Sequence, residues 1–144
     1  MSTEAPAIAF VEDSDLDFEM AVRAVRAIAP EARVLRGQTF HDAVKILAEP
    51  RLRLLVLDIN LPTCNGLDIL QQIQKLDEAR RIKVVVFSTS SNPADRTAAL
   101  SSGAVGYHEK PSDTQAYFDT VAAFVEPWLD GPATDPTRPP EPTP

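Results

Sequence analysis

Cysteine and long apolar runs are both scarce in this chain of 144 residues. Cys64 is the only cysteine, so an internal disulfide is excluded, as is typical of a reducing compartment. The sequence has no run of about 18 apolar residues, which argues against a transmembrane helix. The first residues, MSTEAPA, lack the basic and apolar segments of a secretory signal. We therefore expect a cytoplasmic protein in which Cys64 is an incidental thiol.

Positive charge is scarce as well. The 14 lysine and arginine residues are outnumbered by 21 aspartate and glutamate residues, which leaves a formal net charge of −7. Binding to nucleic-acid phosphates or to an anionic membrane surface requires clustered basic side chains, so we expect neither partner. Apolar residues make up 44% of the chain, which is enough for one hydrophobic core.

The segment 131–144 differs in composition from the rest of the chain. It holds six of the 13 prolines and no large apolar side chain, so it cannot bury enough surface to offset its ordering entropy. We therefore expect one domain over residues 5–130, followed by a disordered or extended proline-rich tail. A proline-rich ligand for a partner protein is the alternative interpretation of this tail.

Short apolar runs alternate with amphipathic segments over the predicted domain. Runs rich in valine, isoleucine and leucine occupy residues 7–11, 32–36, 52–58, 82–88 and 104–108. Segments with helical periodicity occupy residues 18–28, 40–47, 67–73, 93–102 and 112–130. The runs indicate strands buried on both faces, and the alternation predicts a doubly wound α/β fold with a parallel sheet. Ligand sites in such sheets lie at the carboxyl ends of the strands.

Polar side chains stand at the ends of these predicted strands. Glu12 and Asp13 end the first strand, and Asp58 ends the third. Ser88 ends the fourth strand, and Lys110 follows the fifth. Three carboxylates in one small crevice are costly to keep ionised unless a cation joins them, and oxygen ligands favour Mg²⁺. Lys110 would add a positive point charge to the same crevice.

The acidic run that begins at Glu12 continues beyond the strand end. We interpret Asp15 and Asp17 as acids of a first helical turn, where they favour the positive end of the macrodipole. Glu19 should be solvated. The pattern Asp-x-Asp-x-Asp also resembles the start of a calcium-binding loop, but Phe18 stands where that loop requires glycine.

Four motifs in order give the chain a resemblance to a known family. These motifs are VED at 11–13, LDINLPTCNG at 57–66, VVFSTS at 85–90 and GYHEKPSD at 106–113. With these motifs the chain resembles the receiver domain of response regulators, the family typified by the bacterial chemotaxis response regulator. The resemblance covers about residues 5–130 and implies a flavodoxin-like fold with strand order 2-1-3-4-5.

The resemblance implies an acceptor and a metal site. Asp58 would be the phospho-acceptor. Asp13 and Asp58 would bind Mg²⁺ together with the backbone carbonyl of Asn60, and Glu12 would act through water. The resemblance also implies that the donor is a phosphohistidine on a sensor histidine kinase. The chemistry agrees with these roles, because phosphoryl transfer to a carboxylate requires alignment and charge stabilisation rather than further covalent help.

The resemblance also implies groups that respond to the phosphoryl group. Lys110 would pair with it, and Ser88 would hydrogen-bond one of its oxygens. Tyr107 would be the aromatic switch, with a packed aromatic that does not move as the alternative. Thr89 is bulkier than the alanine or glycine common at its position, so we expect it to narrow access to Asp58. The bond from Lys110 to Pro111 is often cis in this family, and His108 should face solvent beside Tyr107.

The implied function is that of a single-domain two-component response regulator, which is not an enzyme beyond self-catalysed phosphotransfer and dephosphorylation. The segments VEDSDLD, LDINLPTCNGLDIL and VVVFSTSSN are similar to the corresponding segments of regulators that pair with bacterial phytochrome kinases. Because only the tail follows residue 130, we expect output through protein contact or phosphorelay. A phosphate-independent scaffold and an aspartyl-phosphate phosphatase stay open as alternatives, although Asn60 stands where such a phosphatase has a second aspartate.

The last predicted helix carries two adjacent apolar stripes, which is broader than a helix packed on one side requires. We therefore take Tyr117, Phe124 and Trp128 as interface candidates and expect a homodimer through the fourth and fifth helices. Pro127 should kink or end the last helix, so that Trp128 projects. The alternative is a tryptophan that folds back on the core.

Overall fold

The structure is a computed structural model that describes residues 5–76 and 82–129. The elements are β1 (Ala7–Val11), α1 (Asp15–Ile28), β2 (Arg33–Gly37), α2 (Phe40–Ile46), β3 (Leu52–Leu57), α3 (Gly66–Gln74), β4 (Lys83–Ser88), α4 (Pro93–Ser101), β5 (Gly106–Glu109) and α5 (Thr114–Leu129). This strict alternation confirms the predicted fold class. Helix α1 begins at Asp15, which agrees with the interpretation of Asp15 and Asp17 as first-turn acids. The largest shifts from the predicted bounds are at the starts of β5 and α5, each of which begins two residues later.

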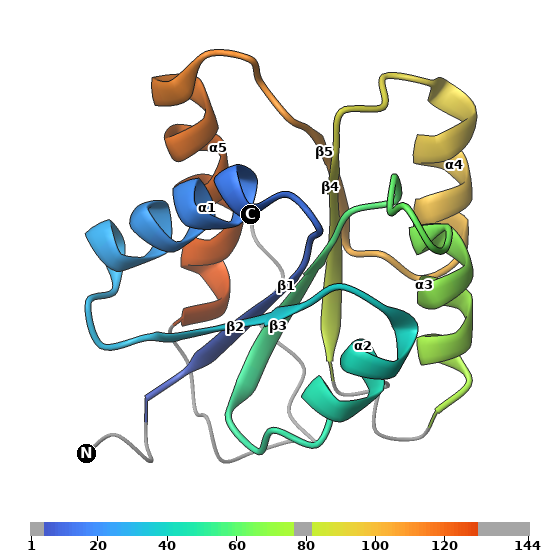
Figure 1. Cartoon of the computed structure of the whole chain (residues 1–144), viewed down its shortest axis with the longest axis horizontal. Helices are drawn as coiled ribbons and strands as arrows, with labels where there is room; N and C mark the ends of the chain where they lie inside the picture. Colours follow the sequence, from blue (N-terminus) through green and yellow to red (C-terminus); the bar gives the residue numbers. More distant parts are fainter. Residues whose placement is uncertain (1–4, 77–81, 130–144) are drawn as a thin grey trace.

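The five strands form one parallel sheet in the order β2-β1-β3-β4-β5, as the resemblance implied. Helices α1 and α5 cover one face of this sheet, and α2, α3 and α4 cover the other (Figure 1). Each face has its own apolar cluster, so the molecule has a helix–sheet–helix arrangement. The domain bounds 5–130 and the nature of the tail stay predictions, because 130–144 lies outside the described residues.

Burial differs between the central and the outer strands. In β1, alternate side chains join the two clusters, so that Ala9 faces α2–α4 and Phe10 faces α1 and α5. In β2, by contrast, only Gly37 is buried, and in β5 only Tyr107 is buried. The prediction of strands buried on both faces is therefore right for the three central strands and wrong for the two outer ones, which have a strand neighbour on one side only.

Side-chain caps set where the helices begin, next to the carboxyl edge of the sheet. Ser14 caps α1 by accepting from the N–H of Asp17 at 3.2 Å, and Asn65 caps α3 by accepting from the N–H of Leu67 at 2.8 Å. Gly66 begins α3 against the turn that follows β3, where its N–H donates to the carbonyl of Ile59 at 3.1 Å. These contacts hold the two strand–helix turns in place.

Two of the three interface candidates on α5, Tyr117 and Phe124, are buried, so the prediction that they form an interface is wrong. Tyr117 and Phe124 are only 3% and 5% exposed, and both rings pack against Phe87, with centroid distances of 5.1 and 5.0 Å. Both side chains belong to the core because they lie where α5 faces the sheet and α1. Trp128 is partly buried against the same cluster, and α5 continues through Pro127 to its end. The homodimer through α4 and α5 stays a prediction, with Trp128 as its remaining candidate.

Membrane insertion was the other structural possibility that composition argued against. Within the described residues, no helix combines the length and apolar character that crossing a bilayer requires.

Candidate functional site

Three carboxylates lie together at the carboxyl edge of the sheet. Glu12, Asp13 and Asp58 each offer an oxygen, and these oxygens lie within 4.8 Å of one another. Main-chain hydrogen bonding extends one residue past β1 and one residue past β3, and it positions Glu12 and Asp58. The N–H of Glu12 donates to the carbonyl of Gly37 at 2.9 Å, and the N–H of Asp58 donates to the carbonyl of Val11 at 3.1 Å. Glu12 and Asp58 are buried, at 5% and 6% exposure, whereas Asp13 is half-buried.

The Lys110 ammonium lies among these acids and contacts three carboxylates. Its Nζ lies 2.5 Å from Glu12 Oε1, 2.8 Å from Asp17 Oδ2 and 3.0 Å from Asp58 Oδ2. The backbone N–H of Lys110 donates to the carbonyl of Ser88 at 2.7 Å, so the end of β4 positions the lysine. No peptide bond within the described residues is cis, so the bond to Pro111 is trans and the expectation of a cis bond is wrong.

Burial and charge act against each other in this cluster. Burial lowers the pKa of the Lys110 ammonium, but hydrogen bonds and charges from the surrounding carboxylates outweigh it and raise this pKa well above its usual range. Burial raises the pKa of Glu12, and Lys110 offsets only part of that rise. When all are ionised, the site holds four carboxylates and one ammonium, so it has an excess of negative charge; the carboxylates are those of Glu12, Asp13, Asp17 and Asp58. The oxygen donors and this excess fit a hard divalent cation such as Mg²⁺.

Asn60 connects Asp58 to the end of the neighbouring strand. Its backbone N–H donates to Asp58 Oδ1 at 2.9 Å, so both carboxylate oxygens of Asp58 have a donor. The Asn60 side-chain amide donates to Ser88 Oγ at 3.2 Å and to Thr89 Oγ1 at 3.4 Å. Ser88 is fully buried, whereas Thr89 is exposed at the rim. The residues predicted from the ends of β3 and β4 therefore do come together.

Tyr107 and His108 point to opposite faces of β5. The Tyr107 side chain is buried, and its hydroxyl donates to the carbonyl of Ser90 at 2.7 Å. His108 is half-buried and stacks on Phe124 at a centroid distance of 5.0 Å, so the prediction of a solvent-facing histidine is wrong. The reason is that α5 covers this face of the strand. Burial, together with the charge of Arg96, lowers the pKa of His108.

Sequence reasoning misses one member of the site, Asp17. The sequence indicates only a helix-start acid at this position, and Lys110 lies 93 positions away in the chain. As predicted, Asp15 lies in the first turn of α1 and Glu19 is exposed. Their pairing with Arg36 and Arg23, respectively, was not predicted. A local signal does exist, since Asp17 belongs to the same acidic run that supplies Glu12. Only the tertiary structure selects Asp17, because it brings Lys110, which follows β5, to 2.8 Å from the Asp17 carboxylate.

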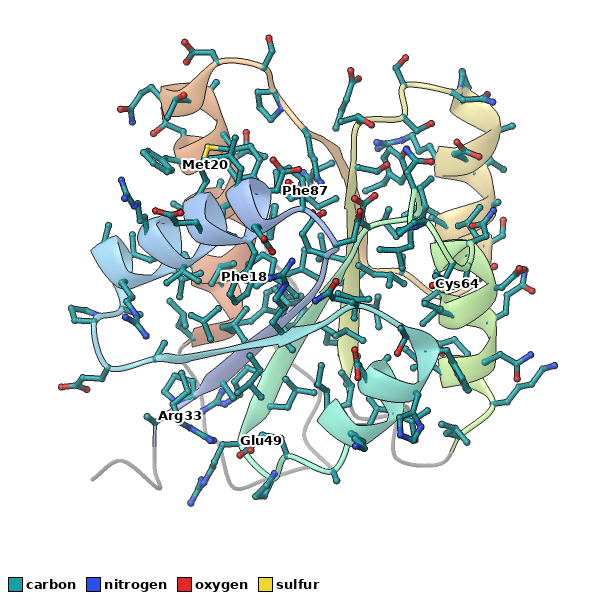
Figure 2. The ribbon with its side chains drawn as sticks, in the orientation of Figure 1. Phe18, Met20, Arg33, Glu49, Cys64 and Phe87 are labelled. Carbon is teal, nitrogen blue, oxygen red and sulfur yellow. The ribbon has the colours of Figure 1, made fainter. Side chains whose placement is uncertain are left out.

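Cys64 and Phe87 lie on opposite sides of the sheet. Figure 2 shows Cys64 beside α3 and Phe87 toward α1 and α5. Cys64 is partly buried against the cluster that α2, α3 and α4 cover. Phe87 lies next to the site, because its ring centroid is 5.9 Å from Lys110 Nζ.

This sheet, with a carboxylate–lysine cluster at its carboxyl edge, defines an α/β protein with a site suited to a hard cation. The sequence profile described as "Response regulator receiver domain" matches residues 8–122. The chain therefore belongs to this family and is the receiver domain of a two-component response regulator.

Curated relatives and solved structures agree with this assignment. The chain is 24% identical to the polar-differentiation response regulator DivK of Brucella anthropi, over 82% of this chain and 94% of that protein. It is 29% identical to the probable methanogenesis regulatory protein FilR2 of Methanothrix harundinacea, over 85% and 83% respectively.

Two solved structures are similar over most of their length. The Mn²⁺-bound response regulator Rcp1 has a TM-score of 0.78 and 26% identity, over 87% of this chain and 95% of that one. The phosphorylated cyanobacterial phytochrome response regulator RcpA has a TM-score of 0.79 and 27% identity, over 87% and 94%.

Proposed function

We propose that Asp58 accepts a phosphoryl group from the phosphohistidine of a sensor histidine kinase. The observation that carries this proposal is the environment of the Asp58 carboxylate. One of its oxygens accepts from the Asn60 N–H and the other from the Lys110 ammonium, and Glu12 and Asp13 lie beside it. Such an arrangement aligns a nucleophilic carboxylate and provides for the charge of an incoming phosphoryl group.

The same residues fit a Mg²⁺ ion. Asp13 and Asp58 would ligate it together with the carbonyl of Asn60, and Glu12 would hold a ligating water. When bound, the ion supplies neutralisation of the charge on the phosphoryl oxygens. The similar response regulator Rcp1 has an Mn²⁺-bound form, which supports the binding of a divalent cation by this chain.

Transfer moves the phosphoryl group from nitrogen to oxygen. A carboxylate oxygen of Asp58 forms the new O–P bond as the P–N bond to the donor imidazole breaks, and the electron pair of that bond stays on the ring nitrogen. Lys110 already donates to Asp58 at 3.0 Å, so a small movement lets it donate to a phosphoryl oxygen instead. The low exposure of the Lys110 side chain, 5%, limits competition from water.

The acyl phosphate would then shift the position of the β4–α4 loop. Ser88 Oγ, which accepts from Asn60 and from the N–H of Ser90 at 3.2 Å, would turn to donate to a phosphoryl oxygen. Tyr107 would follow, because its hydroxyl is bound to the carbonyl of Ser90. Moving an equilibrium from 1:99 to 99:1 requires about 5.5 kcal/mol of differential interaction.

The partner is proposed more narrowly from similarity to RcpA, a phytochrome response regulator. We propose a phytochrome-type histidine kinase in the cytoplasm as donor, with output through protein contact, including a homodimer through α4 and α5. A regulator of this type would act as a phosphorylation-dependent signal rather than as an enzyme with its own substrate.

Intact mass spectrometry tests the proposal directly. The protein is incubated with an active phytochrome-type kinase, ATP and Mg²⁺, and in parallel with acetyl phosphate. Wild type and Asp15→Asn, an exposed acid outside the carboxylate cluster, should gain one phosphoryl group, whereas Asp58→Asn should gain none. Chelation of Mg²⁺ should abolish the gain. If wild type gains no mass with either the kinase or acetyl phosphate, the proposal is refuted and the phosphate-independent scaffold is favoured.

A further inference from the structure

The ammonium of Lys110 has all three of its N–H donors engaged. A lysine ammonium can donate three hydrogen bonds, and Glu12, Asp17 and Asp58 take one each. A phosphoryl oxygen on Asp58 can therefore obtain a hydrogen bond from Lys110 only when one of these carboxylates gives its own up. Asp58 is the acceptor itself and Glu12 lies at the metal site, which leaves Asp17 as a competitor from outside the predicted machinery.

The Asp17 side chain does not accept the backbone hydrogen bond that an acid at this position of a helix often accepts. In a capping box, an acidic side chain at this position reaches back to the backbone N–H of the capping residue. Here the N–H of Ser14 donates instead to Glu12 Oε2 at 3.0 Å. The Asp17 carboxylate is thereby left to accept from Lys110.

The backbone of Asp17 is held from two sides. Its N–H donates to the hydroxyl of Ser14 at 3.2 Å, and its carbonyl accepts from the hydroxyl of Tyr117 at 3.1 Å. The second contact comes from α5, whose Tyr117 ring packs on Phe87 beside Lys110. With side-chain exposure of 25%, the carboxylate is a largely fixed partner of the lysine.

We propose that Asp17 is a positioning residue that competes with the phosphoryl group for Lys110 and so weakens the phosphorylated state. The proposal rests on the proposed function of Asp58. Two effects act in the same direction. Asp17 holds one N–H of Lys110, and it keeps a negative charge close to the place where a phosphoryl group brings more negative charge.

A purely structural role for Asp17 predicts the opposite outcome. If Asp17 only held the site together, its loss would loosen Lys110 and weaken the binding of any phosphoryl analogue. Glu12 and Asp58 would still pair with Lys110 in its absence, so the ammonium would not become an unpaired buried charge. Because damage to the fold cannot tighten binding, a gain of affinity identifies competition.

Binding of beryllofluoride, an analogue of the phosphoryl group, tests the proposal at saturating Mg²⁺. Isothermal titration calorimetry and ¹⁹F NMR measure its affinity for wild type, Asp17→Asn and Asp15→Asn. The control removes the same charge from the same helical turn, but Asp15 is exposed and pairs with Arg36. Asp17→Asn should bind about tenfold more tightly than wild type, the worth of one hydrogen bond to a charged group. Asp15→Asn should stay within about twofold of wild type.

Two further measurements separate the inference from the proposed function. In a Lys110→Met background, the gain from Asp17→Asn should fall from about tenfold to about twofold or less, because competition for the lysine is lost and only the removal of the nearby negative charge remains. A gain that stays near tenfold there, or Asp17→Asn binding no tighter than Asp15→Asn, would overturn the inference while wild-type binding leaves the role of Asp58 standing. If wild type itself does not bind beryllofluoride with Mg²⁺, the proposed function fails and the inference fails with it.

Discussion

Substitution of Gly66 by alanine is a sharp test of how the site is built. Gly66 is the first residue of α3, and its backbone lies against the turn that carries Asp58. A Cβ atom at Gly66 would lie 2.3 Å from the carbonyl oxygen of Asp58 and 2.6 Å from Cα of Ile59. Both are backbone atoms and cannot rotate away. The requirement for glycine is therefore one of space, since its φ is not positive.

The size of the effect follows from this geometry. The contact falls 0.7 Å short of the 3.0 Å below which real Cβ contacts are essentially unknown, so α3 and the turn must separate by at least that amount. The separation strains the hydrogen bond from Gly66 N–H to the carbonyl of Ile59. Overpacking costs about 1–3 kcal/mol and a lost hydrogen bond about 1 kcal/mol, so we expect a loss of about 2–4 kcal/mol in the free energy of unfolding.

Urea unfolding of wild type, Gly66→Ala and Gly106→Ala measures this loss. Gly106 is a matched control because its Cβ would meet the imidazole of His108 at 3.2 Å, a side chain that can give way, and we expect a cost below about 1 kcal/mol. The slope of the transition should be the same in all three proteins. Equal midpoints for Gly66→Ala and Gly106→Ala would refute the reasoning that backbone contact at Gly66 decides the geometry of the turn.

Two further predictions concern Thr89 and His108. Thr89→Ala should speed labelling of Asp58 by acetyl phosphate, because the exposed Thr89 side chain lies at the rim of the site, joined to Asn60; an unchanged rate would contradict a steric role. Stability in urea should fall as the pH drops below about 6.5, because burial against Phe124 lowers the pKa of His108 in the folded protein and the unfolded chain takes up its proton first. His108→Gln should flatten this part of the profile, and an equal pH dependence in both proteins would show that another group is responsible.

Much of the fold can be predicted because its signals are local. The run at 7–11 matches β1 residue for residue, and the segment that opens on Pro93 matches α4 to within one residue. The alternation of short apolar runs with segments of helical periodicity is enough to indicate a parallel sheet. A parallel sheet places the carboxyl ends of its strands at one edge. For that reason the sequence pattern alone is enough to bring Glu12, Asp58 and Lys110 together.

The errors lie where a long-range contact chooses between two local possibilities. The apolar stripes of α5 indicate surplus surface, yet Tyr117 and Phe124 both pack on Phe87. His108 follows Tyr107 by one residue, which favours a solvent-facing side chain, but α5 covers its face of β5. The extent of each buried face depends on neighbours that are distant in sequence, and periodicity within one element does not report them.

Sequence alone determined the order of the elements and the residue types at the edge of the sheet. Both follow from short-range periodicity and from the residues that begin and end helices and strands. Only the tertiary structure decided which of the acids in the run from Glu12 to Glu19 reaches the lysine. Asp15 and Asp17 are equivalent as first-turn acids, yet one pairs with Arg36 and the other with Lys110. The direction of a side chain from a helix depends on its position around the axis, and its partner depends on which strands fold beside that helix.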